Sequence, residues 1–203
     1  MCGICEKESR NSLCYECRKK LQKEFKFTKI SSKRQNFSEQ YYLFQYKNLI
    51  RNLILKMKFQ KESYIYKTIE HFLQNNKKYL EKLKKYDIII VVPLSWKRRL
   101  QRGYNQSQLI AEIISNILQI KIESKILYKT KNIVPQSTLN KKDRKENIKG
   151  AFKIKYIEKI KNKKILIIDD IYTTGNTLNE CAKMFIKEGI KKENIGVLTL
   201  AKD

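Results

Sequence analysis

The chain has 203 residues, of which 41% are hydrophobic and 32% charged, with a formal net charge of +25 at pH 7 and only 6 Gly and 2 Pro. This composition excludes collagen-like and disordered chains and fits one domain of ordinary size with a small appendage. The longest apolar run, Ile88–Leu94, is far shorter than the roughly 20 residues of a membrane-spanning helix, and the first residues do not resemble a secretory signal. We therefore expect a cytoplasmic protein without a membrane span, which could also act at the inner face of the membrane.

The positive charge is spread along the chain. Residues 1–85 carry 21 basic and 8 acidic side chains (net +13), and residues 86–203 carry 24 and 12 (net +12). Such a surface attracts polyanions, including nucleic acids and phosphorylated ligands. Because 37 of the 45 basic residues are Lys and the chain is rich in Ile and Asn, an AT-rich coding sequence explains the excess equally well. The scarcer arginines are more informative, and Arg98, Arg99 and Arg102 lie within five residues.

Four of the five cysteines lie in the first 17 residues, at Cys2, Cys5, Cys14 and Cys17. Two Cys-x-x-Cys pairs in a reducing compartment predict one tetrahedral zinc site, since each pair grips the ion from one side. A redox pair and incidental cysteines are the alternatives. Cys181 lies instead on the apolar face of a predicted helix, which indicates a core residue.

Residues 21–85 form a basic region between the cysteines and the rest of the chain. Arg18–Arg34 predicts a helix that leads into a loop, and Gln40–Tyr46 reads as an aromatic-rich strand. Leu49–Phe59 repeats apolar residues at a helical period, and Tyr64–Leu83 predicts a second basic helix. Aromatic residues of the strand beside so many lysines (Tyr41, Tyr42, Phe44 and Tyr46) suggest stacking on the bases of single-stranded DNA.

From residue 86 the pattern alternates between strands and helices. Predicted strands are Ile88–Val92, Ile122–Leu127, Ala151–Ile154, Lys164–Ile168 and Ile195–Leu200; predicted helices are Gln106–Leu118 and Leu178–Lys187. Continuous β-branched runs are typical of strands buried on both faces. We expect an α/β domain with a mostly parallel sheet flanked by helices. The predicted division is therefore a four-cysteine finger at 1–20, a basic helical region at 21–85 and an α/β core at 86–203.

The most informative segment is Ile165–Thr177, ILIIDDIYTTGNT. Here a buried strand ends in two carboxylates, Asp169 and Asp170, and the following turn opens a helix. Backbone N–H groups and hydroxyls at a helix N-terminus favour a phosphate, whereas carboxylates would repel it and suit hydroxyl donors. The segment therefore predicts a ribose phosphate ligand, at the edge of the sheet where open α/β folds bind their ligands.

This segment resembles the signature of type I phosphoribosyltransferases, which bind 5-phosphoribosyl-1-pyrophosphate (PRPP). The segment VPLSWKRRLQRGYNQS (Val92–Ser107), the pattern from Gln136 to Phe152 and the four-cysteine knuckle are similar to the ComF family of competence-associated proteins. The resemblance covers nearly the whole chain. It implies a type I phosphoribosyltransferase fold with an N-terminal zinc finger and a role in natural transformation.

The resemblance also implies roles for individual residues. Asp169 and Asp170 would be the catalytic pair that holds the ribose hydroxyls, while the 5′-phosphate would bind to the turn Thr173, Thr174, Gly175, Asn176 and Thr177. The pyrophosphate loop would comprise Leu94, Ser95, Trp96 and Lys97, with Arg98, Arg99 and Arg102 close behind. Mg²⁺ would accompany PRPP, and a lid loop would include Gln136, Arg144 and Asn147.

Each of these assignments has a simpler alternative. One carboxylate of the acid pair could cap the following turn, and Arg98–Arg102 could be a solvated basic turn. Asn105 could cap the following helix or contact the ligand together with Gln106.

Three functions remain open at this stage. The chain could be a phosphoribosyltransferase (a pentosyltransferase) of nucleotide metabolism with an unidentified acceptor, or a PRPP-sensing regulator without turnover. It could also be a DNA-uptake protein that binds PRPP and single-stranded DNA and contacts other uptake proteins. The sequence leaves the oligomeric state open.

Overall fold

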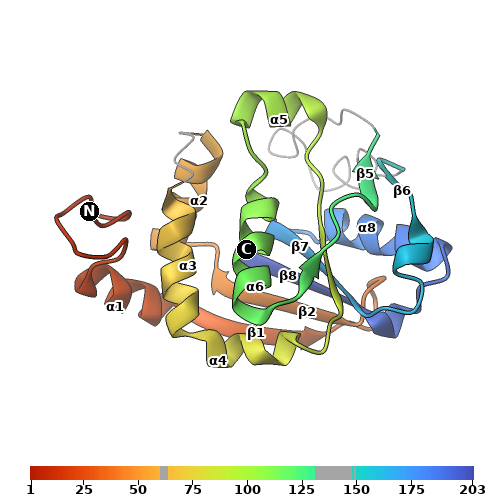
Figure 1. Ribbon diagram of the computed structural model, residues 1–203, viewed down its shortest axis with the longest axis horizontal. Helices are drawn as coiled ribbons and strands as arrows, with labels where there is room; N and C mark the ends of the chain where they lie inside the picture. Colours follow the sequence, from red (N-terminus) through yellow and green to blue (C-terminus); the bar gives the residue numbers. More distant parts are fainter. Residues whose placement is uncertain (60–63, 131–147, 149) are drawn as a thin grey trace.

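The computed structural model describes residues 1–59, 64–130, 148 and 150–203 (Figure 1). One six-stranded sheet runs through the molecule in the order β1-β2-β8-β7-β3-β4. Its strands are β1 (Phe25–Ser31), β2 (Glu39–Gln45), β3 (Ile88–Val91), β4 (Lys121–Ile122), β7 (Ile165–Tyr172) and β8 (Ile195–Lys202). The β1–β2 pairing is antiparallel and the others are parallel. This is the mostly parallel α/β sheet that the sequence predicts.

Helices cover both faces of this sheet. They are α1 (Tyr15–Glu24), α2 (Asn48–Phe59), α3 (Ile65–Asn75), α4 (Lys77–Leu80), α5 (Trp96–Arg102), α6 (Gln106–Leu118) and α8 (Asn176–Lys187). A separate antiparallel hairpin pairs β5 (Leu127–Lys129) with β6 (Phe152–Ile154). Short 3₁₀ turns occupy Glu81–Leu83, Ile157–Lys159 and Lys192–Asn194. In Figure 1, α1 to α3 lie at one end of the sheet and α8 with the hairpin at the other.

Two hydrophobic cores lie on the two faces of the sheet. Ile89, Val91, Leu166 and Ile168 belong to the first core, which also contains residues of α1, α2, α3 and α6. Ile88, Ile90, Ile165 and Ile167 belong to the second, with residues of α8 and the hairpin. Successive side chains of a strand point to opposite faces, so the uninterrupted apolar runs of β3 and β7 supply both cores.

The amino-terminal finger is packed onto the first core. Cys2, Leu13, Cys17 and Leu21 are all buried within it. Cys181 is buried in the second core, as the sequence predicts. None of the helices among the described residues is long and apolar enough to cross a membrane.

Three local predictions were wrong. The loop expected after α1 is strand β1, whose Phe25 and Phe27 pack against the first core. The strand expected at Ile122–Leu127 is divided between β4 and β5. The helix expected over Tyr64–Leu83 breaks at Asn76, which leaves helical geometry (φ −112°, ψ 18°) while its side-chain amide donates to the carbonyl of Phe72.

Two of the four aromatic residues expected to stack on bases, Tyr41 and Phe44, are buried, whereas Tyr42 and Tyr46 are partly exposed. Tyr41 and Phe44 are 1% exposed. The ring of Phe44 packs edge-on against Phe25 and lies next to Phe72. Side chains held this deeply contribute to the first core, and the prediction that Tyr41 and Phe44 stack on DNA bases was wrong.

The carboxylate of Glu39 ties β1 and β2 to the segment before β3. It forms ion pairs with Lys29 and Lys85 and accepts hydrogen bonds from the hydroxyls of Tyr41 (2.6 Å) and Tyr86 (2.8 Å). Burial alone would raise the pKa of Glu39, but the hydrogen bonds from Lys29, Lys85, Tyr41 and Tyr86 lower it to about 2. The network therefore fixes the ring of Tyr86 in one position.

That fixed ring explains why a glycine stands at position 196 of β8. A Cβ atom added to Gly196 would overlap the ring atoms of Tyr86. We expect Gly196→Ala to lower the free energy of unfolding by about 1–3 kcal/mol through overpacking, measured by urea denaturation. In a Tyr86→Ala background the same substitution should cost much less. An equal cost in both backgrounds would show that Tyr86 does not impose the glycine.

Candidate ligand pocket and metal site

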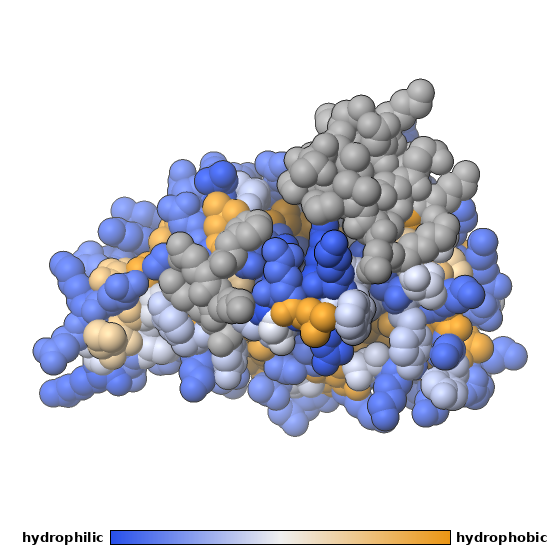
Figure 2. All heavy atoms as spheres, turned by 90° about the horizontal axis from the view of Figure 1, so that it is seen from above, coloured by the Kyte–Doolittle hydropathy of each residue, from blue (hydrophilic) through white to orange (hydrophobic). Residues whose placement is uncertain are grey.

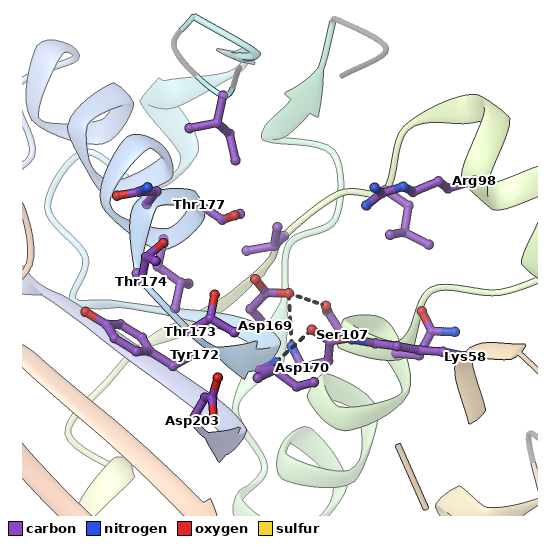
Figure 3. A pocket seen from close by; sticks show the side chains of 18 of the residues that line it. Lys58, Arg98, Ser107, Asp169, Asp170, Tyr172, Thr173, Thr174, Thr177 and Asp203 are labelled. Atoms are coloured by element: carbon purple, nitrogen blue, oxygen red, sulfur yellow. Dashed lines mark hydrogen bonds and ion pairs between the residues drawn. The ribbon is translucent and has the colours of Figure 1, made fainter. Parts of the chain in front are cut away.

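A pocket of about 400 Å³ opens at the carboxyl ends of β3 and β7 (Figure 3). Viewed from above, the molecule has a mostly hydrophilic surface with small apolar areas (Figure 2). Of the residues that the sequence predicts for the site, these line the pocket: Leu94, Arg98, Arg102, Asp169, Asp170, Thr173, Thr174, Gly175, Asn176 and Thr177. It also includes Tyr46, Leu55, Lys58, Gln106, Ser107, Lys129 and Asp203. The structure thus brings both carboxylates, the threonine turn and two arginines to one cavity.

The acid pair lies close to the carboxyl end of β7. The strand keeps one parallel register with β8 from the pair Ile165–Ile195 to the pair Tyr172–Lys202. Both carboxylates line the pocket because it opens beyond this end of the sheet, where side chains of both strand faces border one cavity.

Both carboxylates also accept backbone hydrogen bonds. Asp169 Oδ1 accepts from the N–H of Asp170 (2.9 Å) and from Ser107 Oγ (2.9 Å), and Asp170 Oδ1 accepts from the N–H of Ile171 (2.7 Å). Burial, and then the charge of Asp170, raise the pKa of Asp169 to about 7 against the opposing effect of these hydrogen bonds and Lys58. These backbone bonds come from the next residue within β7 and not from the turn Thr173–Thr177 that a capping carboxylate would serve. The other oxygen of Asp170, Oδ2, pairs with Lys58.

The threonine turn opens α8 through a glycine in the left-handed region. Gly175 precedes α8 with φ 74°, in the left-handed region that favours glycine. A Cβ at this position would also overlap the ring of Tyr172. The chain therefore folds tightly, so that the backbone at the start of α8 lies beside the hydroxyls of Thr173, Thr174 and Thr177 (Figure 3).

The predicted pyrophosphate loop is partly helical and only partly at the pocket. α5 begins at Trp96, and Ser95 is buried. Leu94, Arg98 and Arg102 line the pocket, whereas Trp96, Lys97 and Arg99 do not appear in its lining, and Trp96 is 72% exposed. Arg98 and Arg102 therefore face the pocket, whereas Arg99 does not line it.

Asn105 could either cap α6 or contact the ligand, and its hydrogen bonds show the capping contact. Its Oδ1 accepts from the N–H of Ser107 (3.1 Å), and its Nδ2 donates to the carbonyl of Val92 (3.0 Å). Asn105 therefore caps α6 and ties it to the end of β3. Gln106 lines the pocket and accepts a hydrogen bond from Arg102 (3.1 Å).

Several pocket residues were not foreseen from the sequence, and three of them carry polar side chains that meet the acid pair or the arginines. Ser107 comes from the first turn of α6, Lys129 from β5 and Lys58 from α2. Burial, followed by the charge of Arg98, lowers the pKa of Lys129. These residues come from three separate elements, so no local sequence motif predicts that they share a pocket. Gln136, Arg144 and Asn147 of the expected lid loop lie outside the described residues.

The four amino-terminal cysteines form one cluster. Their sulfur atoms all lie within 4.8 Å of one another, and Cys5 and Cys14 have sulfurs 3.7 Å apart. A Zn–S bond of about 2.3 Å in a tetrahedron places sulfurs about 3.8 Å apart. The donor set therefore fits a metal such as zinc. Burial acts to raise the pKa of Cys2, but hydrogen bonds from the backbone of Cys14, Cys5 and Ile4 outweigh it and lower the pKa to about 6.

A second hollow lies between the finger helix and the β2–α2 connection. Its lining comprises Lys20, Lys23, Glu24, Lys26, Gln45, Lys47 and Asn48. The four lysines are exposed, and Glu24 accepts hydrogen bonds from the N–H groups of Leu49 and Ile50 at the start of α2. We call this region the lysine notch. It adjoins the ligand pocket along the chain, because Tyr46 lines the pocket between two residues that line the notch.

Comparison with known proteins agrees with this arrangement. Residues 104–203 match the phosphoribosyl transferase domain family. Competence protein F of Haemophilus influenzae is 35% identical over 154 residues, which cover 74% of this chain and 66% of that protein. Competence protein ComFC of Streptococcus pneumoniae is 32% identical over 73% of this chain and 62% of its own length. DNA utilization protein YhgH of Escherichia coli (strain K12) is 33% identical over 51% of this chain and 44% of its own length.

The matched segments thus span between 44% and 66% of these relatives. A purine phosphoribosyltransferase from Pyrococcus horikoshii aligns with 81% of this chain and 88% of its own, at 17% identity and a TM-score of 0.31, which is too distant to support an argument. Sequence similarity over most of the chain, the domain match and the four-cysteine cluster all point to one group of proteins. The chain belongs to the family of competence protein F and ComFC, with a phosphoribosyl transferase domain at residues 104–203.

Proposed function

We propose that this chain binds PRPP in the pocket at the end of β7 and serves in the handling of DNA during natural transformation. One observation carries the proposal: two carboxylates, a helix-opening threonine turn and two arginines line a single cavity. A ligand with hydroxyls between two phosphorylated ends matches that arrangement. The names of the related competence and DNA utilization proteins support the cellular role.

Each part of PRPP has a matching group in the pocket. The 5′-phosphate binds the turn Thr173–Thr177, where backbone N–H groups and the α8 N-terminus favour an anion. The ribose hydroxyls donate to Asp169 and Asp170. The diphosphate binds near Arg98, Arg102 and Lys129, whose positive charges all border the same cavity.

The carboxylates also offer the hard oxygen atoms that Mg²⁺ prefers. Lys58 already pairs with Asp170 Oδ2, and Ser107 donates to Asp169 Oδ1. Because Lys58 occupies Oδ2 of Asp170, a hydrated Mg²⁺ that accompanies PRPP would be held mainly by oxygens of the ligand.

The reaction class that follows is transfer of the phosphoribosyl group. The bond between C1 of the ribose and the diphosphate breaks, and a bond from C1 to an acceptor forms. In this scheme the chain mainly positions the sugar and stabilises the charge that develops on the departing diphosphate through Arg98, Arg102 and Lys129. Tyr46 and Leu55 border the pocket from the preceding region and are the nearest candidates for an acceptor contact.

Replacing both carboxylates with amides tests the ligand assignment. Asp169→Asn/Asp170→Asn should weaken PRPP binding in calorimetric titrations with Mg²⁺, because charge-assisted contacts of roughly 1.5–3 kcal/mol each are lost. Binding of inorganic pyrophosphate, which has no sugar, should change less. The control Asp87→Asn/Glu193→Gln removes the same charge from exposed positions outside the pocket lining. Equal PRPP affinity in the wild type and the pocket variant would contradict the assignment.

Turnover separates a transferase from a PRPP-sensing regulator. Protein, PRPP and Mg²⁺ would be mixed with nucleobases, nucleosides or single-stranded DNA, and pyrophosphate release would be measured. Release that depends on one acceptor identifies a transferase, and tight PRPP binding without release for any acceptor supports the regulator.

The four-cysteine cluster is proposed to hold one structural Zn²⁺. Elemental analysis of protein purified without chelator should find about one zinc per chain, as a closed four-thiolate site requires. Cys5→Ser should lower the zinc content and the melting temperature, because Cys2 and Cys17 are buried in the first core and the finger loses its cross-link. Cys181→Ser, which changes a cysteine outside the cluster, should leave the zinc content unchanged. Full folding of a zinc-free finger would contradict the proposal.

The lysine notch is the proposed contact for the phosphates of single-stranded DNA. A Zn²⁺ bound by four thiolates has a formal charge of −2, so the finger's affinity for DNA must come from the basic residues beside it. Four exposed lysines around one hollow provide that charge, and a strand leaving the notch reaches the rim of the PRPP pocket at Tyr46.

Removing the notch charges should therefore weaken DNA binding. A variant with Lys20, Lys23, Lys26 and Lys47 changed to Gln should bind single-stranded DNA less tightly. Its binding should also depend less on salt, because each lost phosphate contact makes the slope of log K against log salt concentration shallower by about 0.7. The matched control changes the exposed Lys161, Lys163, Lys164 and Lys191, which precede β7 and β8. Equal losses in both variants, measured by fluorescence anisotropy, would indicate attraction by net charge without a specific surface.

A further inference from the structure

Lys58 of α2 reaches into the ligand pocket and pairs with the acid pair (Figure 3). Its Nζ lies 2.6 Å from Oδ2 of Asp170, and the two side chains are only 17% and 16% exposed. Among the described residues, the other ion pairs involve at least one better-exposed group; Lys56 and Glu6, for example, are 32% and 63% exposed. A pair this sheltered from water is weakly screened, so its charges strongly affect what binds beside it.

The position of Lys58 is fixed by contacts other than its ion pair. Leu53, Ile54 and Met57 of α2 are buried in the first core. The carbonyl of Met57, one residue before Lys58, accepts hydrogen bonds from Tyr104 Oη (2.5 Å) and Gln106 Nε2 (3.3 Å). These contacts hold α2 in place without Lys58. The ion pair is therefore not needed to position the helix.

The charges of the pocket indicate what the ion pair does. Asp169 and Asp170 place two carboxylates side by side in the cavity proposed to take a ligand with several negative charges. Their repulsion for such a ligand is usually offset by a bound divalent cation. Here the ammonium group of Lys58 already offsets the charge of Asp170 and closes its Oδ2 to another cation.

We propose that Lys58 is a built-in counter-cation for the acid pair, which occupies Oδ2 of Asp170 and makes sugar-diphosphate binding only weakly dependent on Mg²⁺. The ligand part of this inference rests on the proposed function. The expected effect of Lys58 on cation binding at Asp170 does not rest on the proposed function, because it concerns only the chain's own side chains. It follows that removal of the Lys58 charge opens a cation site at Asp170.

The first experiment needs no PRPP. Zinc-loaded full-length protein would be titrated with Mn²⁺, and free Mn²⁺ would be measured by electron paramagnetic resonance. Lys58→Met, which keeps the length and removes the charge, should bind Mn²⁺ at least about tenfold more tightly than the wild type, and Lys58→Arg should behave like the wild type. Adding Asp170→Asn to Lys58→Met should abolish the gain.

Lys56→Met is the matched control, because Lys56 lies two residues away on the same helix and pairs with the exposed Glu6. It should not change Mn²⁺ binding. If Lys58→Met does not fold, as judged by its melting curve and zinc content, Lys58→Gln replaces it. Equal Mn²⁺ affinity in the wild type and a folded, charge-free variant at position 58 would overturn the proposal.

The second experiment measures PRPP affinity by calorimetry at Mg²⁺ concentrations from about 0.1 to 10 mM, a range chosen to bracket weak binding of Mg²⁺. The affinity of the wild type and Lys58→Arg should change little over this range, whereas that of Lys58→Met should rise steeply with Mg²⁺. Parallel Mg²⁺ dependences would overturn the proposal. Failure of every variant to bind PRPP would contradict the proposed function, while the Mn²⁺ titration would still decide the role of Lys58.

Discussion

Two adjacent carboxylates at the end of a buried strand set the main constraint on this molecule. Asp169 and Asp170 repel each other, and burial raises the pKa of Asp169 to about 7. The surrounding structure meets this constraint with hydrogen bonds from Ser107 and the local backbone and with the ion pair to Lys58. Because α2, α6 and β7 each supply part of that support and all pack in the first core, the pocket depends on the assembly of that core.

The topology of the sheet brings these contacts of the acid pair to one edge. β3 and β7 are parallel neighbours, so the residues that follow them meet at one edge of the sheet. β2 joins the same sheet through β8, and the following helix, α2, carries Lys58 to that edge. The lysine notch lies beside the same β2–α2 connection, which puts the proposed contacts for DNA and for PRPP on adjoining surfaces.

Much of this could be predicted from the sequence, because the relevant signals are local. Continuous apolar runs gave β3 and β7, and the acid pair with Thr173–Gly175 indicated a turn into a helix. β1 was missed because its residues FKFTKIS are half-buried at best, and a strand that covers one edge of a core lacks a strong apolar run. The ion pair between Lys58 and Asp170 joins residues 112 positions apart, and only the tertiary structure brings them together.

In the proposed complex, the acid pair contacts the sugar of a phosphoribosyl ligand while the threonine turn holds its phosphate. The most direct test is a crystal structure of the zinc-loaded protein with PRPP and Mg²⁺. We expect ribose hydroxyls within hydrogen-bond distance of Asp169 and Asp170 and the 5′-phosphate at Thr173–Thr177. A ligand whose ribose lies away from both carboxylates, or whose 5′-phosphate sits beside Arg98 and Arg102, would contradict it.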